Sequence, residues 1–264
     1  MPTNTQNFSN KRIAKNTLIV YTRLFFVSII GLFTSRYVLQ ALGVSDFGLY
    51  NVVGSLLAIL SFLSGSLTTT TTRFINIEEG KEDGNTNKIF NACLLIHIVV
   101  AAILLILAET IGIFYIRNYL NVSKGMEGPA MFVFQVSIVV ACLGLINIPY
   151  QGLLMAKEKF SVIAVVEIIN CIIKFILVLL LFIFANDRLQ VYAIFMSFTT
   201  LISFIAFHWY CYSKWKHIIK KKLTIKNTNI KEVLKFNNYN LLSSLSLTIR
   251  DQGSNMLINY FFGT

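Results

Sequence analysis

Long apolar runs separated by short polar segments make up most of the chain. The runs are mostly about 20 residues or longer, and none shows the alternation of apolar and polar positions that is typical of a strand. A helix needs about 20 apolar residues to cross the hydrocarbon core of a bilayer. The pattern therefore predicts seven helical spans, roughly over residues 16–35, 47–72, 89–116, 130–155, 161–185, 189–212 and 236–263.

These spans predict an all-α fold, a polytopic transmembrane helical bundle with about seven spans. We expect a polar N-terminal segment (1–15), a six-span N-terminal bundle (16–212), a basic linker (213–235) and a seventh span (236–264) that begins a second bundle. The first apolar run contains Arg23 and lacks a small-residue cleavage site. We therefore interpret it as a retained span and not as a signal peptide.

Composition agrees with a membrane protein, and the placement of charge predicts its orientation. The chain is 55% hydrophobic and 13% charged, with 23 Lys and Arg against 12 Asp and Glu. In a soluble protein this excess would suggest nucleic acid as a partner, but eight lysines lie in the linker alone. By the positive-inside rule, the N-terminus and the linker should be cytoplasmic. The segments then predicted outside hold only four basic residues: Arg36, Arg117, Lys124 and Arg188.

The sequence offers no pattern typical of a soluble catalytic domain. It has no phosphate-binding or dinucleotide-binding glycine motif, no HExxH or GxSxG, and no paired cysteine spacing. The three histidines stand alone, and the four cysteines fall in separate apolar runs. We expect no catalytic residue, metal site or cofactor, and we interpret the cysteines as inert core thiols.

The fifth predicted span carries three polar residues along one face, at i, i+3 and i+7: Glu167, Asn170 and Lys174. Lys174 lies about 20 Å along this span, too deep for its side chain to regain the interface easily. Glu167 and Lys174 are about 10 Å apart along the axis, so a direct ion pair between them is not expected. The pattern fits a hydrated functional stripe or a structural pair that joins two helices, and both interpretations remain open.

Charges also occur within other predicted spans. Arg250 and Asp251 lie deep in the seventh span, and successive helical residues point about 100° apart, so they should face different neighbours. Arg23 and Glu109 lie nearer to helix ends, where reaching the interface competes with a functional role. We select Lys174, Arg250, Arg23 and Asn170 as candidate substrate-binding residues, with Glu167 and Asp251 as candidates for ion coupling.

Two further patterns concern helix packing. Ser61, Ser64, Thr68 and Thr72 recur at helical spacing in the second span, which most often indicates close helix packing. In the fourth span, Pro149 and Gly152 lie near the end that is predicted to be cytoplasmic, and proline removes a backbone donor. We expect a kink at these two residues.

Three stretches resemble the polysaccharide transporter family, which contains the O-antigen and capsule flippases. Residues 36–50 (RYVLQALGVSDFGLY) are similar to the family pattern R-x-L-x-x-x-L-G-x-x-x-[FY]-G-x-Y. Residues 148–160 (IPYQGLLMAKEKF) resemble P-Y-x-x-L-L-x-A-x-E-[KR]-F. Residues 251–263 (DQGSNMLINYFFG) resemble the seventh span of the family.

This resemblance implies a fold of two six-helix bundles in the bacterial inner membrane and export of a polyprenyl-diphosphate-linked oligosaccharide by alternating access. The implied partners are the bilayer, the lipid-linked glycan and polysaccharide-assembly proteins. Five further spans would follow the seventh, so the resemblance implies that the chain is a fragment or a truncated product. The carried glycan and the coupling ion stay open.

Two other functions fit a polytopic helical protein. A multidrug or small-cation exporter of the same superfamily should have acids dominating its cavity, and here bases lie within the predicted spans. A membrane enzyme of polysaccharide assembly should show a large outer loop or a deep catalytic histidine. The predicted outer loops are short and the histidines are scattered.

Overall fold

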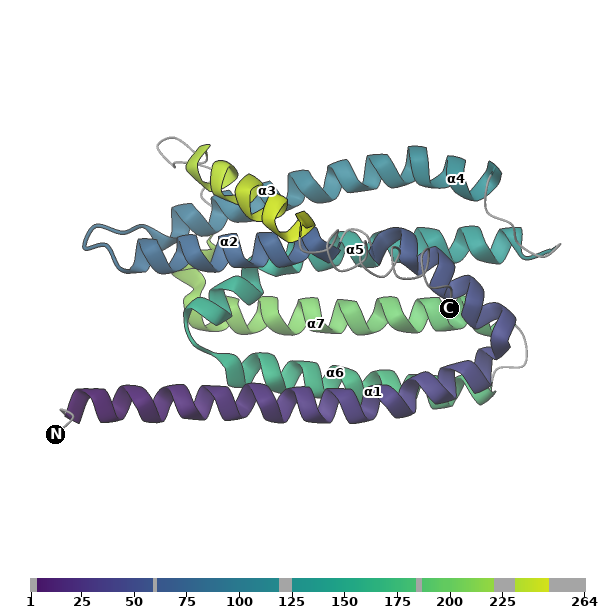
Figure 1. Cartoon of the computed structure of the whole chain (residues 1–264), viewed down its shortest axis with the longest axis horizontal. Helices are drawn as coiled ribbons and strands as arrows, with labels where there is room; N and C mark the ends of the chain where they lie inside the picture. Colours follow the sequence, from purple (N-terminus) through teal and green to yellow (C-terminus); the bar gives the residue numbers. More distant parts are fainter. Residues whose placement is uncertain (1–3, 59–60, 119–124, 184–186, 221–230, 247–264) are drawn as a thin grey trace, which may run out of the picture.

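The computed structural model describes residues 4–58, 61–118, 125–183, 187–220 and 231–246, and these are helical apart from short turns (Figure 1). Five of its helical segments are long and apolar enough to cross a membrane: Asn10–Gly54, Thr86–Asn118, Glu127–Ala156, Phe160–Ile183 and Arg188–Ile219. Together with the sequence pattern, they confirm an all-α multi-pass membrane bundle. They contain or closely match the predicted first and third to sixth spans.

The first helix, α1 (Asn4–Ala58), bends back on itself at Gly43. Gly43 has φ of 77° and ψ of 173°, a backbone conformation that glycine adopts without strain. Arg188, the first residue of α7 (Arg188–Ile219), donates a hydrogen bond from Nη1 to the carbonyl oxygen of Ala41 at 3.1 Å. This bond gives a partner to a carbonyl oxygen next to the bend. The first two predicted spans are therefore joined by a tight bend within one helix and not by a loop. We call residues 4–42 the first leg of α1 and residues 44–58 its second leg.

The predicted second span falls on two helices. Its first part is the second leg of α1, and its last part belongs to α2 (Ser61–Glu79), with residues 59 and 60 outside the described residues. Serine and threonine lower the hydropathy of α2, which is not among the five crossing segments. The predicted seventh span is described only up to residue 246, within a helix over residues 231–246.

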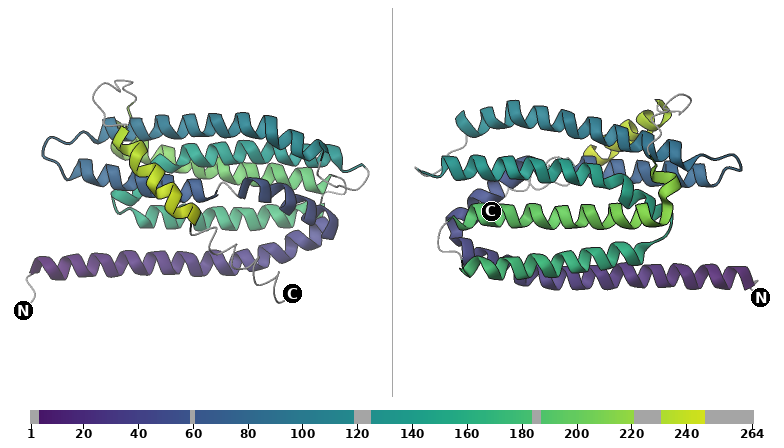
Figure 2. Two further views of the ribbon diagram at one scale, coloured as in Figure 1. Left: turned by 45° about the horizontal axis from the view of Figure 1, so that its top comes forward. Right: turned by 180° about the vertical axis from the view of Figure 1, so that it is seen from behind.

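The remaining helices stack side by side around α5 (Glu127–Ala156), which packs against α2, α3 (Thr86–Leu107) and α7 (Figures 1 and 2). The helix α3 continues through a π-helical turn, η1 (Ala108–Gly112), into α4 (Ile113–Asn118). The helix α6 (Phe160–Leu180) ends in the 3₁₀ turn η2 (Leu181–Ile183) and lies along the first leg of α1. Buried Val133, Phe134 and Ile138 of α5 form the centre of the core.

Pro149 and Gly152 have different effects on α5. The helix continues through Pro149, and Figures 1 and 2 show that its last turns bend toward α6. Gly152 lies against α2, and a Cβ atom placed on it would be 2.8 Å from Cγ2 of Thr71. The glycine therefore allows a close approach of α2 and α5, which is a packing role that we did not expect for it.

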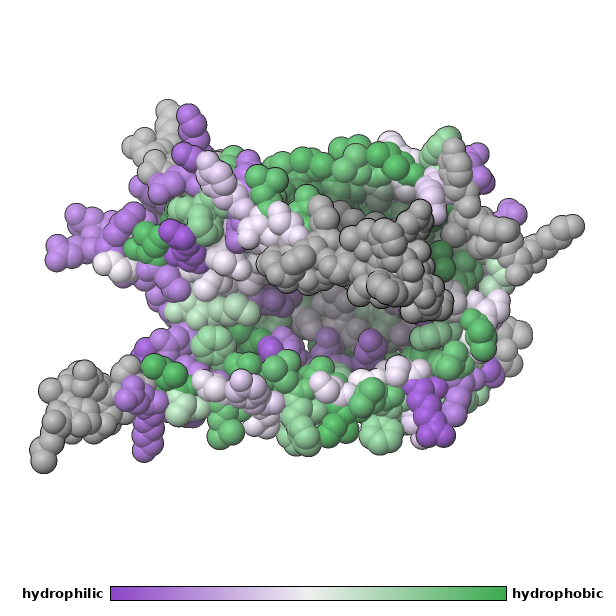
Figure 3. Space-filling model, in the orientation of Figure 1, coloured by the Kyte–Doolittle hydropathy of each residue, from purple (hydrophilic) through white to green (hydrophobic). Residues whose placement is uncertain are grey.

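Most of the predicted cytoplasmic segments meet at one end of the bundle, which Figure 3 shows as a hydrophilic end on the left. There Lys157 pairs with Glu79 at 2.5 Å, and Arg12 pairs with Glu158 in the turn between α5 and α6. The side-chain amide of Asn87 donates to the carbonyl oxygens of Ile218 and Lys220, at 2.6 and 2.9 Å. These contacts join the starts or ends of six helices on one side of the bundle.

The helix over residues 231–246 packs across α2. Its Asn237, which is 5% exposed, accepts hydrogen bonds on Oδ1 from Ser66 at 3.3 Å and from Thr70 at 3.2 Å. The guanidinium group of Arg73 lies over the ring of Phe236, with its central carbon 4.2 Å from the ring centroid. The contact is made by Ser66 and Thr70, which lie on roughly the opposite side of α2 from the predicted stripe of small residues, so the packing role of that stripe stays a prediction.

Candidate functional site

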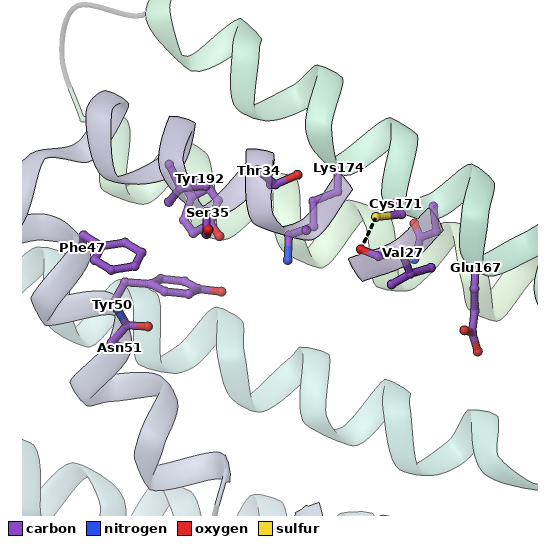
Figure 4. A pocket seen from close by; sticks show the side chains of 13 residues that line it. Val27, Thr34, Ser35, Phe47, Tyr50, Asn51, Glu167, Cys171, Lys174 and Tyr192 are labelled. Carbon is purple, nitrogen blue, oxygen red and sulfur yellow. Dashed lines mark hydrogen bonds between the residues drawn. The ribbon is translucent and has the colours of Figure 1, made fainter. Parts of the chain in front are cut away.

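A cavity of about 550 Å³ lies between the two legs of α1 and the helices α6 and α7 (Figure 4). Both legs contribute because the bend at Gly43 folds the second leg back toward the first. The lining mixes aliphatic and aromatic side chains with hydroxyl, amide and charged groups: Val27, Gly31, Thr34, Ser35, Val38, Phe47, Tyr50, Asn51, Glu167, Asn170, Cys171, Lys174 and Tyr192. The cavity therefore offers a polar interior within a predominantly apolar bundle.

Lys174 extends from α6 toward the middle of this cavity (Figure 4). The side chain is half-buried, and no acidic residue within the described part of the chain forms an ion pair with it. Its ammonium group also has no hydrogen-bond acceptor among those residues. An uncompensated cation in a partly dehydrated cavity attracts an anionic ligand more strongly than an exposed lysine does.

Glu167 lies on the same face of α6 and pairs with Arg23 of α1. The Arg23 Nη1 atom is 3.2 Å from Oε1 and 3.1 Å from Oε2 of Glu167. This pair joins α1 to α6, and it leaves Lys174 without Glu167 as a partner, in line with the axial separation expected from the sequence. The Nε atom of Arg23 is buried and has no hydrogen-bond partner among the described residues.

Asn170 connects α6 to α7 at the edge of the cavity. Its Nδ2 atom donates a hydrogen bond of 2.8 Å to Oγ of Ser203. Its Oδ1 atom is buried and lacks a partner within the described residues. An acceptor in this state can take a hydrogen bond from a water molecule or from a ligand hydroxyl.

The sequence did not single out the polar groups that α1 and α7 add to the cavity. Tyr50 and Tyr192 pack edge to face, with ring centroids 4.7 Å apart, and Asn51 lies beside them (Figure 4). Thr34 and Ser35 also line the cavity, and their hydroxyls donate to backbone carbonyl oxygens of their own helix. Tyr50 lies in the first stretch that resembles the family (36–50), and this resemblance was the sequence feature that could have identified it as a functional residue.

The other candidate residues lie elsewhere. Arg250 and Asp251 are outside the described residues, so their place relative to the cavity stays a prediction. Pro149 and Gly152 do not line the cavity, because they lie on the side of α5 that faces α2 and the core. Glu109 lies on the π-helical turn and accepts a hydrogen bond from Gln135 at 3.2 Å.

In the part of the chain that the structure describes, no group of three or more His, Cys, Asp or Glu side chains could hold a metal ion. All four cysteines are free thiols. One carboxylate outside the five crossing segments has a shifted pKa. Glu78 accepts the backbone N–H of Asn85 and pairs with Lys81, and these contacts lower its pKa below the usual value.

Comparison with known proteins gives one match. The model of a family described as polysaccharide biosynthesis protein matches residues 13–264. No curated protein and no solved structure matches the chain. The family match covers α1 with its bend, the cavity and the residues beyond α7.

Proposed function

Because the chain belongs to the polysaccharide biosynthesis protein family, we propose that it takes part in flipping a polyprenyl-diphosphate-linked oligosaccharide across the bacterial inner membrane. The oligosaccharide is a repeat unit of O-antigen or capsule, and it moves from the cytoplasmic to the outer leaflet by alternating access. The protein changes the position of this substrate and not its covalent structure, so the proposal is a transporter and not an enzyme.

Lys174 is the observation that carries the proposal. Its ammonium group lies in the cavity without an acidic partner among the described residues. If a diphosphate oxygen lay about 4 Å from the ammonium nitrogen, the attraction would be roughly 4 kcal/mol for each negative charge, at an effective dielectric constant of about 20. The cavity thus favours an anionic group at a depth where charge is otherwise costly.

The rest of the lining fits the sugar part of such a substrate. Tyr50 and Tyr192 offer aromatic rings together with hydroxyls, and Asn51 and Asn170 offer amides. Sugars present alternating hydroxyl and C–H surfaces, which match hydrogen-bonding groups mixed with aromatic rings. We propose Asn170 and these neighbours as the glycan contacts, with Arg250 as a second cation for the diphosphate.

Glu167 and Asp251 are the proposed coupling residues. Protonation of Glu167 would remove the charge that holds Arg23, and Arg23 would then become available to the substrate. This arrangement gives a carboxylate whose proton occupancy changes the charge of the cavity. Among the described residues that line the cavity, Glu167 is also the sole acid, and its pairing with Arg23 disfavours a small-cation exporter.

The N-terminus and the basic end of the bundle are proposed to face the cytoplasm. Lys11, Arg12, Lys157 and Lys220 lie at this end, together with most of the other basic residues outside the spans. The positive-inside rule supports this orientation. Enzymes that assemble the glycan on its lipid carrier would then deliver the substrate at this end.

Replacing Lys174 with Gln tests the proposal in cells that depend on this protein. We expect surface polysaccharide to fall at least about tenfold, since a loss of about 1.4 kcal/mol in substrate binding is a factor of ten. Lys174→Arg keeps the charge and should restore most of the export. The matched control is Lys159→Gln, an exposed lysine outside the cavity. Equal membrane abundance must be verified by immunoblot, and unchanged polysaccharide in Lys174→Gln would refute the role of Lys174.

A further inference from the structure

A second cavity of about 600 Å³ lies at the basic end of the bundle, apart from the central cavity. It forms between the start of α1 and the turn from α5 to α6. We call it the end groove, and its lining residues are Arg12, Ile13, Asn16, Thr17, Val20, Tyr21, Glu158 and Phe160. None of them lines the central cavity, so the proposed transport does not use this groove directly.

The lining of the end groove changes from polar to apolar along α1. Arg12, Asn16 and Thr17 come first, with Ile13 between them, and Val20 and Tyr21 follow toward the middle of the span. Arg12 and Tyr21 are nine residues apart along α1, which is about 13 Å of helix. The headgroup layer on each side of a bilayer is about 5–8 Å thick, so the groove extends from this layer into the first part of the hydrocarbon.

The charge around the end groove favours an anionic occupant. Arg12 has a side chain that is 69% exposed, and Lys11, Lys15 and Lys159 lie exposed on the same end of the bundle. The acid in the lining, Glu158, is paired with Arg12 and accepts a hydrogen bond of 3.3 Å from Asn16. In the lining Glu158 offsets Arg12, and the exposed Lys11, Lys15 and Lys159 near it leave a net positive field at the mouth of the groove, which attracts anionic headgroups.

We infer that the end groove binds an anionic phospholipid of the surrounding leaflet. The phosphate group lies at Arg12, where Asn16 and Thr17 can donate hydrogen bonds to it or to the ester groups. The acyl chains lie against Val20, Tyr21 and Phe160. Because the phosphate and Glu158 compete for Arg12, the bound lipid loosens the contact between α1 and the turn from α5 to α6.

The test uses the purified protein in nanodiscs of phosphatidylcholine with increasing phosphatidylglycerol. Retained phosphatidylglycerol is counted by native mass spectrometry after release. We expect Arg12→Gln to lower the apparent affinity for phosphatidylglycerol at least fivefold. The matched control is Lys11→Gln, which removes the same charge from the neighbouring residue, about 100° around the helix and outside the groove. An equal loss in both variants would show diffuse attraction and would overturn the site.

Two further variants separate a lipid site from a folding defect. Val20→Trp fills the apolar part of the groove and keeps the Arg12 pair, and it should lower phosphatidylglycerol retention as Arg12→Gln does. Glu158→Gln removes the competing acid and should raise the affinity two- to threefold. Unchanged or weaker binding in Glu158→Gln would contradict a phosphate at Arg12. If the protein retained phosphatidylcholine as well as phosphatidylglycerol, the groove would not select an anionic lipid. If the protein were a dimer that Val20→Trp dissociates, a second copy of the chain and not a lipid would occupy the groove.

Discussion

At the scale of single residues, Gly152 is the position where a small change should have a large effect. A methyl group there would lie 2.8 Å from Cγ2 of Thr71, so α2 and α5 would have to move apart. We expect Gly152→Ala to destabilise the protein by about 1–3 kcal/mol, as overpacking of a close contact does. The measurement is the thermal unfolding of the purified protein in detergent.

Two variants make this prediction specific. Gly144 lies on the same helix, and a Cβ atom placed on it would have no neighbouring atom within 4 Å, so Gly144→Ala should leave stability unchanged or slightly higher. Adding Thr71→Ser to Gly152→Ala removes the clashing methyl group and should recover part of the loss. Equal unfolding temperatures for the two alanine variants would show that the close approach is not needed.

Single residues also show what could be predicted without a structure. The depth of Lys174 follows from counting residues along an apolar run, so its place inside the bundle was predictable. The pairing of Arg23 with Glu167 was not, because it depends on α1 and α6 lying side by side, 144 residues apart in sequence. Tyr50 and Asn51 reach the cavity only because α1 bends at Gly43.

At the scale of helices, the contact between α2 and the helix over residues 231–246 should be detectable by cross-linking. Ser66 Oγ lies 3.3 Å from Asn237 Oδ1, and both side chains are buried. With the four native cysteines replaced by alanine, a Ser66→Cys/Asn237→Cys pair should form a disulfide on mild oxidation. We expect at least about fivefold more cross-linking than in a Thr69→Cys/Asn237→Cys pair, because disulfides require Cβ atoms within about 4.5 Å.

Thr69 is a suitable control because it is exposed and hydrogen-bonds within its own helix, to the carbonyl oxygen of Gly65. Similar cross-linking in both pairs would mean that the two helices do not hold this register. In a transporter that alternates, the cross-link should also slow export, since it ties α2 to the helix over residues 231–246.

Helix ends were less predictable than helix cores. The apolar pattern located five crossing segments to within a few residues at most of their ends, because burial in lipid requires uninterrupted apolar side chains. It placed a loop between the first two spans, whereas Gly43 and the bond from Arg188 to Ala41 make a tight bend. Arg188 and Ala41 are 147 residues apart, so the sequence around Gly43 does not predict the hydrogen bond between them.

At the scale of the whole molecule, the proposed orientation predicts opposite labelling of the two ends. Glu82 lies in the turn between α2 and α3 at the basic end, and Asn118 ends α4 at the other end. In intact cells, an impermeant maleimide should label Asn118→Cys at least about tenfold more than Glu82→Cys if the basic end is cytoplasmic. Permeabilised cells provide the control, in which both positions should react. Stronger labelling of Glu82→Cys than of Asn118→Cys in intact cells would show that the basic end faces outward and would contradict the proposed orientation.

A reconstituted flipping assay tests most directly whether the Lys174 cavity carries a diphosphate-linked glycan. The full-length protein is placed in liposomes with a fluorescent polyprenyl-diphosphate oligosaccharide, and an impermeant quencher reports which leaflet holds it. We predict rapid flipping that slows about tenfold in Lys174→Gln and recovers in Lys174→Arg, because a lost charge contact of about 1.4 kcal/mol is a factor of ten. Flipping at the same rate in Lys174→Gln, or no faster than in protein-free liposomes, would contradict the account.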